Sequence, residues 1–157
     1  MIRRTSNRRL LVALTVVLAL AGCHRRTLYH HFEHTPLSGW ERNDTLLFSV
    51  VPARQSAVVQ REVELRISEK FPFQRLTLVV EQTTLPSNRH RRDTVHCTLV
   101  DSDGKSLGHG LSMRQQEFPL PDISLNEGDS LSVTIHHIMS RETLTGISDV
   151  GLLLQVY

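Results

Sequence analysis

From residue 44 onward, apolar and polar residues alternate along most of the chain. Successive side chains of a β-strand point to opposite faces, so a period of two is typical of a strand with one buried face. The alternation is clearest in five stretches, residues 46–50, 62–67, 75–82, 93–100 and 131–139. Each of these stretches is predicted to form a half-buried strand.

Residues typical of turns separate these stretches. Asp101–Gly104 and Asn126–Asp129 place carboxylates and amides beside a glycine, as tight turns between strands require. Residues 105–113 contain two glycines and are predicted to form a bulged strand, and 118–121, with two prolines, an edge segment. The run 150–157 is the most apolar and is predicted to be a central strand.

Seven or eight short strands, with no amphipathic helical run of twelve or more residues, predict an all-β fold. We expect a single antiparallel β-sandwich of jelly-roll or immunoglobulin-like type, with a closed barrel as the alternative. Two stretches stay open: residues 140–149 suit a helical turn or a long loop, and 56–60 either belong to the second strand or lead into it.

The first 22 residues have the pattern of an export signal. Four arginines precede an uncharged apolar run at 10–20, and small residues follow it. Eleven residues span about 16 Å as a helix, half of the hydrocarbon core of a bilayer, so a retained transmembrane helix is excluded. Residues 23–40 show no sustained period and are predicted to be a tether leading into a domain at 41–157.

Leu20-Ala21-Gly22-Cys23 resembles the lipobox of bacterial lipoproteins, which implies that Cys23 is acylated and becomes the first residue of the mature chain. The acyl chains of a lipoprotein hold it at a membrane almost permanently, because each buried methylene contributes about 0.8 kcal/mol. No acidic cluster follows Cys23, and we therefore expect the periplasmic face of the outer membrane.

Removal of residues 1–22 reverses the sign of the net charge. The precursor carries +2, whereas the remaining 135 residues hold 14 basic and 16 acidic residues. A nucleic-acid partner needs a basic surface that this balance does not supply, and that class is excluded. Cys97 lies in an alternating run and is predicted to be a small core residue.

The sequence contains no local motif of a known catalytic mechanism, and we expect no enzymatic activity, cofactor or small-molecule substrate. His30, His31 and His34 lie in the predicted tether, where no helix would fix their geometry, so no metal site is expected. Residues 89–92 form a basic cluster, either a solvated loop tip or a contact for anionic lipid. Trp40 offers one aromatic platform for a sugar.

Several segments, in order and with compatible spacing, make the chain similar to the gliding-motility lipoprotein GldH family of the Bacteroidota. Phe71 and Phe73 stand where we expect tyrosines in that family. The segments are the lipobox at Cys23, Trp40 with Asp44–Leu46 and Phe48, Leu65-Arg66, Phe71-Pro72-Phe73, Asp93-Thr94, Asp101–Lys105, Leu107–Gly110, Met139 and Leu144–Leu152.

The resemblance implies a non-catalytic accessory component of gliding-motility machinery, or of its associated secretion system, anchored in the cell envelope. We expect it to act by binding an envelope protein. A glycan- or lipid-binding module is the alternative, and a cryptic hydrolase is the third hypothesis. The expected partner contacts are Trp40, Phe71, Pro72, Phe73 and Arg141.

Overall fold

The computed structural model describes residues 26–156, and these residues form ten strands and no helix. None of the described residues belongs to a helix long and apolar enough to cross a membrane. The strands are β1 (Arg26–His34), β2 (Trp40–Glu41), β3 (Leu46–Val50), β4 (Ala57–Ser68), β5 (Arg75–Leu85), β6 (Arg89–Thr98), β7 (Met113–Leu125), β8 (Ser130–His137), β9 (Thr143–Leu144) and β10 (Ile147–Val156).

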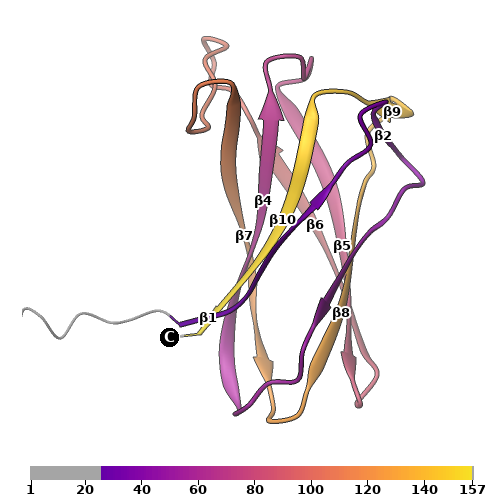
Figure 1. The fold of residues 1–157 in the computed structure, drawn as a ribbon, viewed down its shortest axis with the longest axis vertical. Helices are drawn as coiled ribbons and strands as arrows, with labels where there is room; N and C mark the ends of the chain where they lie inside the picture. The colour runs from indigo at the N-terminus through magenta and orange to yellow at the C-terminus, as the bar shows by residue number, and fades with distance from the viewer. Residues whose placement is uncertain (1–25, 157) are drawn as a thin grey trace, which may run out of the picture.

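Eight of these strands form two four-stranded sheets that face each other (Figure 1). One sheet has the order β1-β10-β4-β7 and the other β3-β8-β5-β6, with every neighbouring pair antiparallel. Each long strand is followed by one in the other sheet, except at the β5–β6 hairpin. This alternation is the jelly-roll arrangement, so the predicted sandwich is confirmed and the described strands do not close into a barrel.

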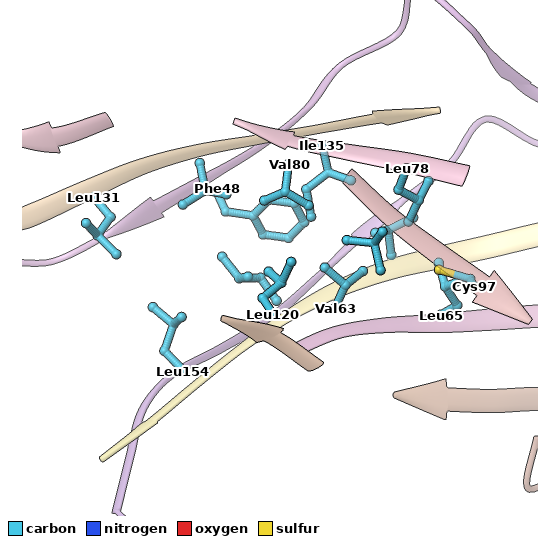
Figure 2. Close-up of a cluster of buried hydrophobic side chains, with 14 of the residues drawn as sticks. Phe48, Val63, Leu65, Leu78, Val80, Cys97, Leu120, Leu131, Ile135 and Leu154 are labelled. Carbon is cyan, nitrogen blue, oxygen red and sulfur yellow. The ribbon is translucent and has the colours of Figure 1, made fainter. Parts of the chain in front are cut away.

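Apolar side chains from both sheets fill the space between them (Figure 2). The alternating stretches face inward as predicted, with Phe48, Val63, Leu78 and Ile135 all fully buried. Cys97 is fully buried too, which confirms its interpretation as a core residue. The apolar run near the end of the chain forms β10, which lies between β1 and β4 as a central strand.

The structure differs from the predicted tether. Residues 26–34 form the edge strand β1, which pairs with β10 along its length, so the domain begins before residue 41. The pairing register shifts between Thr27 and Tyr29, and a bulge of this kind breaks the alternation that identifies a strand in a sequence. An edge strand also has one unpaired side, so its residues stay partly exposed and partly polar.

Two loop predictions also change. The sequence predicts a bulged strand at residues 105–113, but residues 105–112 make only isolated bridges, Val100 to Ser106 and His109 to Gln115, before β7 begins at Met113. Gly110 has a φ of +120°, which ends regular pairing there. Residues 140–149 are neither a helical turn nor one long loop. They contain the two-residue strand β9 and the first residues of β10.

A buried arginine links the two sheets. Arg61 on β4 is 1% exposed and donates to the Pro121 carbonyl of β7 (2.8 and 3.0 Å). Its guanidinium also donates to Gln82 Oε1 on β5 (3.0 Å) and to Asp93 Oδ2 on β6 (2.8 Å). Four strands therefore meet at one side chain, on the side of the sandwich where β6 and β7 approach each other.

The loops gather at two ends of the sandwich (Figure 1). The N-terminal end contains the start of β1, residues 51–56 and the turn at 126–129. The Ala53 N–H donates to the Asp129 carbonyl (2.8 Å), and the Ala53 carbonyl accepts from the Gly128 N–H (2.8 Å). The far end contains residues 35–39, 69–74 and 138–146. Nine residues of β1 join the two ends, a span of about 30 Å.

Candidate functional site

The far end brings together two segments that are about 70 residues apart in the sequence. Gly146 packs directly on the backbone of Phe71, because a Cβ at Gly146 would lie 2.5 Å from Phe71 N. Ser68 donates to the Gly146 carbonyl from both its N–H (2.7 Å) and its Oγ (3.2 Å). The aromatic-proline step and the loop before β10 are thus one joined surface.

Trp40 supports this surface from below and does not reach solvent. The indole is 0% exposed, its Nε1–H donates to the Asp44 carbonyl (2.9 Å), and its backbone pairs with Leu144. The expected contact of Trp40 with a partner, and its use as a sugar platform, are therefore wrong. The short strands β2 and β9 pair with each other and cover the far end of the core. The Trp40 side chain, at the start of β2, is buried as part of this cover.

The other four expected contacts reach the surface to different degrees. Pro72 and Arg141 are exposed, and Phe71 and Phe73 are half-buried. The two phenylalanine rings contact each other edge to face, with centroids 5.6 Å apart, and both rings also pack against the core. Their geometry is fixed by the core, and one side of each remains available.

A groove of about 460 Å³ continues this surface toward the loop that follows β1. Pro36 and Leu37 line one side, and Lys70 and Gly146 line another. Leu37 is fully exposed (108%), so its isobutyl group is in water. Sequence reasoning missed Leu37, and its only signal was an apolar residue next to a proline in a segment without periodicity. We call Leu37, Phe71, Pro72, Phe73 and Arg141 the far-end surface.

His137 lies beneath the far-end surface. It is 0% exposed, and its ring contacts the Trp40 ring edge to face, with centroids 5.2 Å apart. Its Nε2 lies 3.1 Å from the Trp40 carbonyl. Burial lowers its pKa and outweighs the hydrogen bond to Trp40, which acts in the opposite direction. His136 points to the other face of β8, as the sequence predicts. His137 is thus a neutral core group that holds β2 on β8.

The remaining histidine cluster is dispersed along β1. His30 Nε2 lies 2.8 Å from Glu64 Oε2, His31 Nε2 lies 3.1 Å from Glu33 Oε1, and His34 pairs with Asp149. No group of three or more histidines, cysteines or carboxylates suited to a metal ion occurs among residues 26–156. The cluster that looks dense in sequence therefore makes separate pairs.

The basic cluster at 89–92 is balanced by carboxylates. Arg89 lies 3.7 Å from Asp129, Arg91 2.9 Å from Asp93, and Arg92 3.5 Å from Glu81. These pairs reduce the positive charge that the hairpin presents to a membrane.

The comparisons with known proteins agree with these observations. The family model described as GldH lipoprotein matches residues 27–154, almost all of the sandwich. This chain belongs to the GldH lipoprotein family. A curated relative, "Gliding motility lipoprotein GldH" of Flavobacterium johnsoniae, is 21% identical over 151 residues, which cover 92% of this chain and 94% of the relative.

Two solved structures match the GldH-family chain at low sequence identity. The mosquito-larvicidal Cry4Aa toxin of Bacillus thuringiensis matches with a TM-score of 0.45 and 12% identity, over 74% of this chain and 19% of the toxin. A family 35 carbohydrate binding module of Clostridium thermocellum matches with a TM-score of 0.38 and 9% identity, over 83% of this chain and 98% of the module.

Three of the segments that carry the GldH resemblance meet at the far end. Trp40 pairs with Leu144, Gly146 packs on Phe71, and His137 lies between β2 and β8. Other such segments lie elsewhere in the sandwich, including Phe48 in the core and Asp93-Thr94 on β6, and Cys23 lies outside the described residues.

Proposed function

We propose that this chain is a gliding-motility lipoprotein that acts by binding an envelope protein through its far-end surface. The observation that carries the proposal is that segments typical of the family, distant in sequence, meet at one end of the sandwich. The exposed Leu37, Pro72 and Arg141 lie at that end.

The proposed anchor is acylated Cys23, with residues 1–22 removed as an export signal. It would place the domain at the periplasmic face of the outer membrane. The N-terminal end of the sandwich follows Cys23 directly, so the far end points away from the membrane, where a partner can reach it. An accessory role in motility or in the associated secretion machinery fits this orientation.

The proposed mode of action is non-catalytic. Its support is that the most buried charged and titratable groups have structural partners: Arg61 links four strands, and His137 holds β2 on β8. Neither group opens onto the far-end groove, whose lining residues are mostly apolar or uncharged. The five residues of the far-end surface carry no hydroxyl, thiol, imidazole or carboxyl group, so this surface offers contact area and shape.

Photo-crosslinking in cells tests the proposal. A photoreactive amino acid at Leu37 or Pro72 is expected to capture the same envelope protein, identified by mass spectrometry. The same amino acid at Val58, which is 50% exposed on β4 at the N-terminal end, is the matched control and should not capture it. Equal capture from all three positions would show that the contact is not specific to the far end.

A substitution pair separates loss of contact from loss of fold. Leu37→Asp should abolish capture from Pro72, whereas Val58→Asp should leave it intact, because both side chains are exposed and apolar but lie at opposite ends. Both variants should keep the wild-type melting temperature to within a few degrees. Undiminished capture from Pro72 in the Leu37→Asp variant would show that the far-end surface is not the partner contact.

A further inference from the structure

A second groove, of about 590 Å³, lies at the N-terminal end of the sandwich. Arg26 and Leu28 of β1 line one side, and Val51, Pro52 and Arg54 of the loop after β3 line the other. No carboxylate lines it. The groove therefore combines two guanidinium groups with an apolar wall.

The two arginines of this groove have no partner among residues 26–156. Neither Arg26 nor Arg54 takes part in an ion pair or a side-chain hydrogen bond there. The arginines of the β5–β6 hairpin differ, since each lies within 4 Å of a carboxylate. Two unpaired guanidinium groups on opposite walls of a groove suit an oxyanion such as a phosphate, which each can bind in a bidentate way.

The length of the chain fixes where this groove can lie. Only His24 and Arg25 separate Cys23 from Arg26, so three Cα–Cα steps join the acylated residue to the groove. Three steps span at most about 11 Å. If Cys23 is anchored in a leaflet, Arg26 lies at the headgroup layer of that leaflet.

We propose that this groove binds the anionic headgroup of a phospholipid in the leaflet that holds the anchor. The proposal rests on the acylation of Cys23 in the proposed function. Arg26 and Arg54 contact the headgroup phosphate, and Val51, which is 68% exposed, lies against the glycerol region. The acyl chains alone leave the domain free to rotate about its anchor, whereas the headgroup contact holds the far end about 30 Å from the membrane.

Fluorescence quenching on vesicles tests this contact with the full mature lipoprotein. A fluorophore at Asn126→Cys, in an exposed turn of the N-terminal end, reports its distance from a quencher attached to lipid headgroups, and one at Thr145→Cys reports the far end. Cys97 does not compete for the label, because burial raises the pKa of its thiol to about 12. The vesicles contain phosphatidylcholine alone or mixed with phosphatidylglycerol.

Phosphatidylglycerol should increase quenching at position 126 and leave position 145 unquenched. Arg26→Gln and Arg54→Gln should each lower the ratio of docked to undocked protein about fivefold, because a basic residue at an anionic surface contributes on the order of this factor. Arg54→Lys keeps the charge and should retain most of the effect. Arg92→Gln, on the balanced hairpin, is the control and should change nothing.

Equal quenching on the two kinds of vesicle, or unchanged quenching in Arg26→Gln with Arg54→Gln, would overturn the headgroup site. Loss of the contact on adding inorganic phosphate at constant ionic strength would assign the groove to a soluble anion and would also overturn it. Flotation of the unlabelled protein with the vesicles distinguishes the two proposals. A protein that does not float lacks the anchor, whereas one that floats without docking refutes the groove alone.

Discussion

At the residue scale, His137 shows how a polar side chain is kept in a β-sandwich core. Its Nε2 lies 3.1 Å from the Trp40 carbonyl, while its Nδ1 has no hydrogen-bond partner among the described residues. Burial is the main cause of its lowered pKa, Arg42 and His136 lower it further, and the Trp40 hydrogen bond and Glu142 raise it. The neutral imidazole is therefore the form that suits the folded state.

The lowered pKa of His137 makes folding sensitive to mild acid. The pKa of His137 is lower in the folded than in the unfolded state. Above a pH of about 6.5 the side chain is neutral in both states, so it does not affect the free energy of unfolding. As the pH falls below that value, the unfolded state binds the proton more readily, and stability is lost. We expect His137→Gln to lose less melting temperature than the wild type between neutral pH and about pH 5. Identical losses in thermal melts of the two proteins would contradict this role.

Gly146 is the residue on which the far-end surface depends. Its φ of +92° is one that side-chain-bearing residues rarely adopt, and an added Cβ would meet the backbone of Phe71. Gly146→Ala should lower the free energy of unfolding by more than about 1 kcal/mol and reduce capture from Pro72. Gly128→Ala is a useful control, since Gly128 also has a positive φ but has open space around it. Chemical denaturation should show a smaller loss for Gly128→Ala.

At the scale of the strands, Arg61 is the residue that links the two sheets. Burial lowers the pKa of Arg61, and the hydrogen bond and charge of Asp93 offset this only in part. Burial would raise the pKa of Asp93, but hydrogen bonds from Arg91 and Arg61 outweigh it and leave that pKa lowered. The pair joins β4 of one sheet to β6 of the other, on a side where no backbone ladder connects the two sheets.

Arg61→Ala is expected to destabilise the sandwich by about 3 kcal/mol, because the Pro121 carbonyl, Gln82 and Asp93 all lose a buried donor. Arg91→Ala removes the more exposed partner of Asp93 and should cost less than about 1 kcal/mol. Urea unfolding of both variants measures the difference. Equal small losses would show that the packing of β6 against β7, and not the guanidinium, holds this side closed.

The strands that the sequence predicts are those whose inner faces fill the core. Residues 46–50, 62–67 and 75–82 alternate because one side of each strand packs against the other sheet. The alternation does not identify β1, because a bulge and an exposed edge leave no regular period there. At residues 105–113 the glycines led to the prediction of a bulged strand, whereas the structure has a loop before β7. Periodicity records burial, and segments at an edge or in a loop carry little of that signal.

At the scale of the whole molecule, the sequence could indicate the far-end surface only in part. Pro72 and Arg141 are exposed as a contact requires, but Trp40 is core, because a sequence does not tell a surface aromatic from one that closes the end of a sandwich. The packing of Gly146 on Phe71 joins residues 75 positions apart, and no local pattern encodes it. The arginines of the N-terminal groove are likewise brought together only by the fold.

The two ends of the sandwich give the molecule its proposed direction. The N-terminal end follows Cys23 by three residues, and the far end lies one strand length beyond. A surface that binds a partner and an end that rests on a membrane are then separated by about 30 Å, and neither obstructs the other. This orientation requires attachment at Cys23, and the proposed headgroup contact in the N-terminal groove then maintains it.

The most direct test is the intact mass of the mature protein, measured together with the fractionation of a Cys23→Ser variant. We expect the wild type to begin at Cys23, to carry acyl chains and to sediment with membranes, and we expect Cys23→Ser to be absent from them. A mature protein of unmodified mass, or a Cys23→Ser protein that remains with membranes at the processed size, would contradict it.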